Sequence, residues 1–155
     1  MRLIHYSTRH LEAVEGRSQD EGRAAIRCDK PNGLWVSVEG EYDWPAWCRS
    51  EGFRTEKLVS ATHVVLHRDA RILHIDTAAG LALFSREYRR MPPNESDLPL
   101  NLLKVGVDWS RIARTYQGII IAPYQWAMRL DSDAEWYYSW DCASGCLWDA
   151  SAVSE

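Results

Sequence analysis

Residues 116–148, YQGIIIAPYQWAMRLDSDAEWYYSWDCASGCLW, contain the strongest strand signals in the chain. The β-branched run at residues 118–121 lies between a glycine and an Ala-Pro pair, a pattern typical of a strand that is buried on both faces. The aromatic run at residues 136–140 predicts a second strand, and residues 146–148 predict a third after a Ser-Gly turn. Asp141 directly follows the aromatic run, where folding alone does not need a charge. Asp141 is therefore the first candidate for a functional side chain.

The chain has 155 residues, which fits one domain with a sizeable core. Its formal net charge of -4 argues against non-specific binding to nucleic acids or membranes, although it leaves room for a small basic groove. Residues 1–7 hold no long apolar run, and no stretch is apolar over the length of a membrane span. We therefore expect a cytoplasmic protein without a membrane partner.

Four cysteines, Cys28, Cys48, Cys142 and Cys146, are expected to be free thiols in a reducing compartment. The Cys142-x3-Cys146 pair could bind zinc with two of the five histidines. However, the spacing is not the usual CxxC, and no second compact pair of ligands exists. Buried thiols that pack as small apolar residues are the interpretation we favour.

Further strands are expected at residues 2–7, 34–38, 62–67 and 71–75, with a tight turn joining the last two. Because strands and helices mix without strict βαβ alternation, the predicted class is α+β. We expect one domain over residues 1–155, with mixed or antiparallel sheets and flanking helices.

Three helices are expected to begin after the N-cap residues Asp43, Thr77 and Asp108, and Gly52 is expected to end the first of them. The second should run to about residue 90, and a short helix is expected to start at His10. Loops are expected at residues 15–29, which are charged and broken by glycine, and at residues 91–101, which are interrupted by proline.

Two strand motifs near the N-terminus carry residue types suited to a site. The first is His5-Tyr6-Ser7-Thr8, and the second is the Gly33-Leu34-Trp35-Val36-Ser37 segment. Taken singly, a histidine or a tryptophan in a strand is more often structural than functional.

Their order resembles that of the ADP-ribosyltransferase fold family, in its diphtheria-toxin and poly(ADP-ribose)-polymerase-like branch. In that branch a His and a small hydroxyl residue lie on the first strand and a G-x-aromatic-x-S motif on the second. A strand of the YDGVII type and an acidic residue follow near the C-terminus. Residues 116–121 and 135–148 would be the corresponding stretches here. The resemblance implies an NAD cleft between the strands that carry His5 and Trp35.

The resemblance also implies roles for single residues in binding NAD as substrate. His5 would anchor a ribose hydroxyl, with Tyr6, Ser7, Thr8 and Ser37 around the sugar and the carboxamide. Trp35 stands where the family usually has tyrosine, and backbone groups near Gly33 would hold the carboxamide. Tyr137 or Tyr138 could supply a second face to stack on the nicotinamide ring.

The reaction explains why an acidic residue is wanted. Cleavage of the nicotinamide–ribose bond builds positive charge on the sugar, and a fixed carboxylate stabilises that charge most in the transition state. We favour Asp141 for this role and keep Glu135 as the second candidate; the alternative for Asp141 is a turn residue that accepts backbone hydrogen bonds. The Glu39-Gly40-Glu41 pattern follows the second strand, where the family does not place its acid.

Two further sets of residues invite a functional interpretation. The first is a tryptophan platform for bases, sugars or a partner protein, formed by Trp44, Trp47, Trp136, Trp140 and Trp148. The second is the histidine trio His63, His67 and His74, a possible set of metal ligands. A tryptophan-rich core and surface histidines are the simpler interpretations.

The sequence thus predicts a monomeric NAD-dependent ADP-ribosyltransferase. By analogy with small stand-alone enzymes of this type, it would be a bacterial or phage effector or toxin. The acceptor, whether protein, nucleic acid or small molecule, is left open. The alternatives are a non-catalytic tryptophan-rich interaction module and, less favoured, an NAD-dependent RNA 2′-phosphotransferase.

Overall fold

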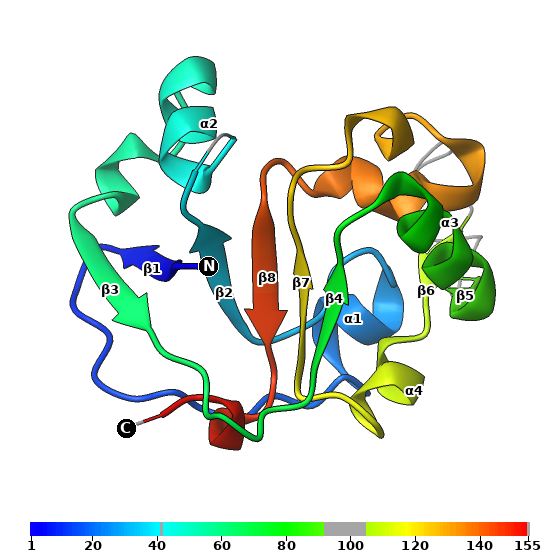
Figure 1. The fold of residues 1–155 in the computed structure, drawn as a ribbon, viewed down its shortest axis with the longest axis horizontal. Coiled ribbons are helices and arrows are strands. Elements are labelled where there is room, and N and C mark those ends of the chain that lie inside the picture. Colours follow the sequence, from blue (N-terminus) through cyan, green and yellow to red (C-terminus); the bar gives the residue numbers. More distant parts are fainter. Residues whose placement is uncertain (41, 92–104, 155) are drawn as a thin grey trace.

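A mixed six-stranded sheet forms the centre of the computed structural model, which describes residues 1–40, 42–91 and 105–154. The strand order is β3-β1-β2-β8-β7-β4 (Figure 1). Only β4 and β7 pair in parallel; the other neighbours are antiparallel. The strands are β1 (Leu3–Ser7), β2 (Leu34–Val38), β3 (Ser60–Val64), β4 (Ile72–Ile75), β7 (Gly118–Ile121) and β8 (Ser144–Leu147). The predicted α+β class with a mixed sheet is confirmed.

Strand β7 lies inside the sheet, between β8 and β4, and all four of its residues are buried. Because side chains alternate along a strand, Ile119 and Ile121 pack into one apolar cluster with Trp136, while Ile120 packs into the cluster on the other face with Leu147. The prediction of a strand buried on both faces is therefore confirmed.

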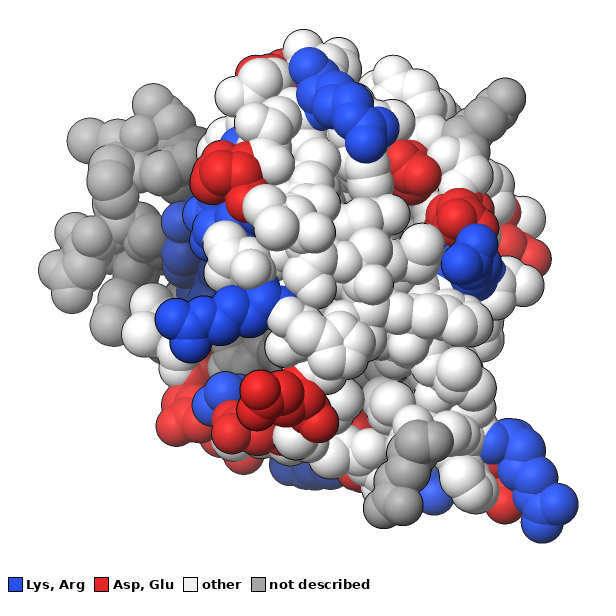
Figure 2. Space-filling view, turned by 90° about the vertical axis from the view of Figure 1, so that its left-hand side faces the viewer, with Lys and Arg blue, Asp and Glu red and all other residues white. Residues whose placement is uncertain are grey.

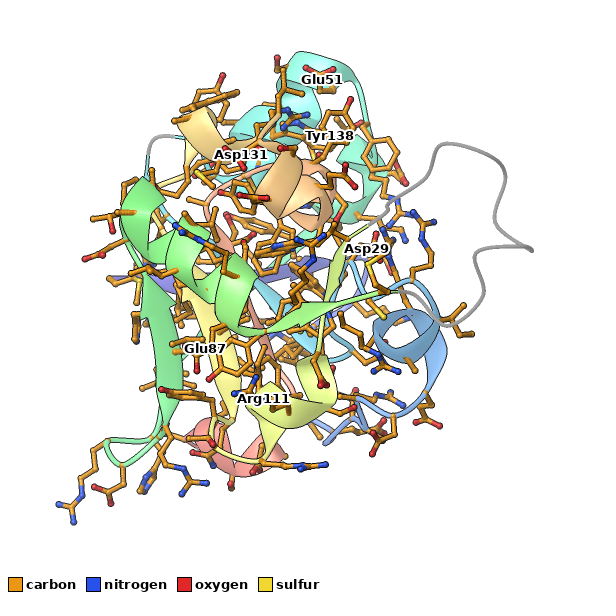
Figure 3. All side chains as sticks on the ribbon, turned by 90° about the vertical axis from the view of Figure 1, so that its right-hand side faces the viewer. Asp29, Glu51, Glu87, Arg111, Asp131 and Tyr138 are labelled. Atoms are coloured by element: carbon orange, nitrogen blue, oxygen red, sulfur yellow. The ribbon has the colours of Figure 1, made fainter. Side chains whose placement is uncertain are left out.

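Three helices begin at the caps predicted from the sequence. Asp43 accepts a hydrogen bond from the Ala46 amide at the start of α2 (Trp44–Glu51), and Gly52 ends this helix in the left-handed conformation. Thr77 caps α3 (Ala78–Glu87), and Asp108 caps α4 (Trp109–Ala113). Figure 3 shows Glu87 of α3 above Arg111 of α4, where Arg111 Nη2 lies 3.9 Å from Glu87 Oε1.

The remaining elements are short. They are α1 (Gly22–Ile26), η1 (Thr55–Lys57), β5 (Arg89–Arg90), β6 (Gly106–Val107), η2 (Trp126–Met128), η3 (Ser132–Ser139) and η4 (Ala150–Ala152), where η denotes a 3₁₀ helix. In the described part of the chain, no helix combines the length and the apolar character that a membrane span needs.

The predicted strand at residues 136–140 is wrong, because most of this stretch belongs to the 3₁₀ helix η3. Successive residues of a strand would face opposite sides of the sheet, whereas Trp136 and Tyr137 are both buried in the same apolar cluster. The indole N–H of Trp136 donates to Ser85 Oγ of α3 over 3.0 Å, which fixes η3 against that helix. Packing between elements therefore outweighs the preference of aromatic residues for strands.

Three other expectations are also wrong. Strands β3 and β4 do not form a hairpin; they lie at opposite edges of the sheet, where β3 pairs with β1 and β4 with β7. Residues 10–14 form no helix, and residues 15–29 are not a featureless loop, because they include α1 and the fully buried side chain of Asp29. Apart from Met91, the loop expected at residues 91–101 lies outside the described residues.

Candidate functional site

A cleft of about 920 Å³ opens beside β1 and β2. This volume is near the upper end of the range of about 300–1,000 Å³ that is usual for ligand pockets. Its walls come from β1, β2, the segment around α1, the α2–η1 segment and the turn before β8. It contains eight of the residues that the resemblance assigns to NAD binding or catalysis: His5, Tyr6, Ser7, Thr8, Gly33, Trp35, Ser37 and Asp141. The two N-terminal motifs and the favoured acid therefore share one cavity.

Antiparallel pairing of β1 with β2 brings the two motifs together. His5 Nδ1 lies 2.8 Å from the Trp35 carbonyl oxygen. Because a carbonyl oxygen only accepts, Nδ1 carries the proton, and in the neutral ring Nε2 is left as an acceptor. Within the described residues Nε2 has no hydrogen-bond partner. His5 Nε2 can therefore accept a hydrogen bond from a hydroxyl group of a ligand.

β2 and β8 come close together at Gly33, which lines the cleft. A Cβ atom at Gly33 would lie 2.4 Å from the Leu147 carbonyl oxygen, so only glycine allows the two backbones to approach this closely. At the other end of β2, the buried Ser37 accepts the Trp44 amide through Oγ over 2.9 Å. That contact fixes the start of α2 against the cleft.

Asp141 lies half-buried between η3 and β8. Burial raises the pKa of its carboxyl group, and the positive charges of Lys30, Arg129 and Arg23 partly oppose that rise. Among the residues that the structure describes, no donor makes a hydrogen bond to its carboxylate. The alternative of a turn residue held by backbone hydrogen bonds is therefore not what the structure shows. The carboxylate is available to a cationic group in the cleft.

Lys30 is a cleft residue that the sequence did not single out. Its Nζ lies 5.1 Å from the centre of the Trp35 ring, and burial lowers the pKa of its ammonium while Asp141 opposes that shift. Its position directly before the Pro31-Asn32-Gly33 turn into β2 was a usable signal, because residues beside that turn must lie near the Gly33 motif. No other basic residue that lines the cleft lies directly beside this turn in the sequence.

Basic side chains outnumber acidic ones in the cleft, although the chain as a whole is acidic. Five basic residues line it, Arg17, Arg23, Lys30, Arg54 and Lys57, against the two acids Glu21 and Asp141. Figure 2 shows charged side chains around the rim of the face it presents, while the middle of that face is mostly uncharged. The lining therefore favours a ligand that carries negative charge.

Three predicted residues do not line the cleft, and all three lie on η3. Tyr137 is buried, and its hydroxyl accepts the Gln125 amide over 3.0 Å. Tyr138 is exposed on the outside of the molecule, under the Arg129 guanidinium (Figure 3). Glu135 is half-buried away from the cleft. Glu41 lies outside the described residues.

The aromatic rings that do face the cleft are Tyr6, Trp35, Trp44 and Trp140. Trp140 is 1% exposed, and its ring centre lies 4.8 Å from that of Trp35 in an edge-to-face contact. Its indole nitrogen is buried without a hydrogen-bond partner among the described residues. The tryptophan platform expected from the sequence is divided, because Trp136 and Trp148 belong to the core while Trp44 and Trp47 stack on each other near the cleft.

The histidine and cysteine sets are not brought together. His63 lies on β3, His67 beyond its end, and His74 on β4 at the opposite edge of the sheet. In the described ranges no three His, Cys, Asp or Glu side chains could hold a metal ion.

All four cysteines are buried free thiols. Burial raises the pKa of the Cys142 thiol in the cleft wall to about 12, so this thiol is neutral and a poor nucleophile.

Comparisons with protein-family models, curated proteins and solved structures find no match to this chain. The functional argument therefore rests on the residues of the cleft and their geometry.

Proposed function

We propose that the chain is an NAD-dependent ADP-ribosyltransferase whose active site is the cleft beside β1 and β2. The observation that carries the proposal is the position of His5, Trp35 and Asp141 in one cavity, although Asp141 lies more than a hundred residues after the other two. A hydroxyl acceptor, an aromatic face and a carboxylate are what binding and activating a nicotinamide riboside require.

Binding would use groups on both strands. His5 Nε2 accepts a ribose hydroxyl, because Nδ1 is engaged by the Trp35 carbonyl group. The Trp35 ring stacks on the cationic nicotinamide ring, which takes the place of the Lys30 ammonium on that face. The basic cleft residues that precede β2 in the sequence, Arg17, Arg23 and Lys30, would supply positive charge for the pyrophosphate.

Catalysis would depend on Asp141. The bond between ribose C1′ and the nicotinamide nitrogen breaks, its electron pair leaves with nicotinamide, and positive charge develops on the sugar. The Asp141 carboxylate stabilises this charge more than it stabilises bound NAD, so it lowers the barrier rather than only improving affinity. The acceptor then forms its bond to C1′ and loses a proton to solvent.

The first test compares two substitutions that should differ in kind. Asp141→Asn keeps the shape of the side chain but removes its charge, so NAD affinity should stay nearly unchanged while nicotinamide release falls by about 100-fold. His5→Ala removes a contact that is present in the ground state as well, so affinity and turnover should fall together. Calorimetric titration with NAD and chromatography of released nicotinamide provide the two readouts.

Asp69→Asn is the matched control, because Asp69 is exposed on the turn between β3 and β4 and does not line the cleft. Circular dichroism checks the fold of each variant. Wild-type turnover in Asp141→Asn would show that another group stabilises the cation. A wild-type protein that neither binds NAD nor releases nicotinamide, with or without cell lysate as a source of acceptors, would favour a non-catalytic interaction module.

A further inference from the structure

The α2–η1 segment forms a separate wall of the cleft. It contributes Trp44, Arg54 and Lys57 to the lining. Figure 1 shows α2 beyond the C-terminal end of β2, whereas α1 lies towards the end at which β2 begins. The basic residues of the cleft therefore fall into two groups at opposite ends of β2.

The α2–η1 wall presents a rigid aromatic surface. Trp44 and Trp47 stack with their ring centres 5.1 Å apart and their planes 18° apart. Phe53 meets both rings edge-on, at 6.3 Å from Trp44 and 5.4 Å from Trp47. The Ser37 hydroxyl accepts a hydrogen bond from the Trp44 amide, so the backbone that carries this ring is tied to β2, while Trp47 and Phe53 pack against the ring itself. An indole held in this way beside a cavity is a suitable surface for stacking a planar base.

The cations on this wall have no carboxylate partner among the described residues. Within the described part of the chain, neither Arg54 nor Lys57 forms an ion pair, and both side chains are exposed. Arg54 instead places its guanidinium 5.0 Å from the Phe53 ring centre, which keeps the charge beside the aromatic cluster. At the other end of β2, by contrast, Arg23 is bound to the buried carboxylate of Asp29.

NAD has one pyrophosphate and no second anionic group, so it can neutralise only one end of the cleft. The α2–η1 end therefore suits a second ligand that carries both an anion and a planar ring. We propose that the acceptor of ADP-ribose is a nucleotide, either free or within single-stranded nucleic acid. Its base stacks on Trp44 and its phosphate binds Arg54 and Lys57. This proposal rests on the proposed transferase function.

Transfer would proceed with the acceptor held at this end. The glycosidic bond of NAD breaks and nicotinamide leaves with the electron pair. An oxygen or ring nitrogen of the nucleotide forms the new bond to ribose C1′ and releases its proton to solvent. No further reactant is needed.

The test separates nucleotide binding from NAD chemistry. Fluorescein-labelled 12-residue single strands of DNA and RNA, and adenosine and thymidine monophosphates as competitors, are titrated without NAD into the wild-type protein and into the double variant Arg54→Gln/Lys57→Gln. The control double variant, Arg68→Gln/Arg86→Gln, makes the same change in net charge outside the cleft. The cleft variant should bind at least about 10-fold more weakly, and the slope of log affinity against log salt for the single strands should become about 1.4 less steep, because two cations are removed.

The second arm measures transfer of labelled ADP-ribose from NAD to monophosphates, to single strands, and to nuclease-treated lysate protein. Label should enter a nucleotide acceptor in the wild type. The Arg54→Gln/Lys57→Gln variant should lose this transfer, while its rate of NAD hydrolysis without an acceptor, measured as nicotinamide release, should stay within about twofold of wild type. Label in the monophosphates would indicate that a free nucleotide can be the acceptor, and label only in the strands would indicate a nucleotide within a polymer. Either result supports the proposal.

Three results would overturn it. They are label confined to protein, no binding of any nucleotide by the wild type, or equal loss of binding in the control variant. Nucleotide binding without any consumption of NAD would instead remove the proposed transferase function and leave the nucleotide site standing.

Discussion

At the scale of single residues, two side chains gain their properties from neighbours distant in sequence. The Trp35 carbonyl group sets the proton position on His5, and burial with an incomplete charge balance sets the pKa of Asp141. Neither effect requires a strained geometry. Both follow from the antiparallel pairing of β1 with β2 and from the turn that brings residue 141 back to the same cavity.

The raised pKa of Asp141 predicts the pH dependence of turnover. Only the ionised carboxylate can stabilise a cation, so kcat/KM, which reports the ligand-free enzyme, should fall as pH decreases through this pKa, at a higher pH than for an ordinary carboxyl group. Of the neighbouring charges that lower this pKa, that of Lys30 has the largest effect. Lys30→Met should therefore move the acidic limb of the profile to still higher pH. The measurement is nicotinamide release over a range of pH at NAD concentrations well below KM, where the rate is proportional to kcat/KM.

Arg68→Met serves as the control, because Arg68 is exposed on the turn after β3 and is not among the groups that act on Asp141. An acidic limb that stays in place in Lys30→Met, or that moves equally in both variants, would contradict the assignment of that limb to Asp141.

Part of the site could be predicted from the sequence because it depends on local strand patterns. The rest could not, because it depends on how distant elements pack together. His5, Gly33 and Trp35 could be found because their strands have clear local signals, and strand pairing then places them together. Arg54 and Lys57 could not, because their position depends on how α2 folds back beyond the end of β2. Residue 141 was found from its charge at the end of an apolar run, although that run is a 3₁₀ helix rather than a strand.

At the scale of elements, the contact between η3 and α3 holds the segment that precedes Asp141. Trp136 is fully buried, and its N–H group donates to Ser85 Oγ, which itself donates to the Leu81 carbonyl oxygen.

The order of the strands in the sheet is a second feature that local sequence patterns did not predict. Residues 62–67 and 71–75 have the sequence of a hairpin, yet β3 and β4 are at opposite edges of the sheet, where β3 pairs with β1 and β4 pairs with β7.

Ser85→Ala tests the η3–α3 contact. It leaves the buried N–H of Trp136 without an acceptor, which should reduce the free energy of unfolding by about 1–3 kcal/mol. The measurement is urea unfolding followed by tryptophan fluorescence. Ser50→Ala on the exposed surface of α2 is the control and should change stability by less than about 0.5 kcal/mol. Equal stability of the two variants would show that the Ser85 contact is not important for the core.

At the scale of the whole molecule, the cleft is assembled from separate parts of the chain around the start and end of β2. The same architecture places the eight tryptophans in different environments. Trp35, Trp44 and Trp140 line the cleft, whereas Trp109 and Trp148 are buried elsewhere and donate to the carbonyl oxygens of Cys28 and Tyr116. The indole N–H groups are therefore built-in reporters of where a ligand binds.

The most direct measurement of the central claim is a titration with NAD that follows the indole N–H signals by ¹H–¹⁵N NMR, assigned through single Trp→Phe variants. The signals of Trp35, Trp44 and Trp140 should shift saturably, with the unpartnered N–H of Trp140 among the most affected. Those of Trp109 and Trp148 should stay in place, because their N–H groups are satisfied away from the cleft. Unchanged cleft signals at millimolar NAD, or shifts confined to Trp109 and Trp148, would contradict the account.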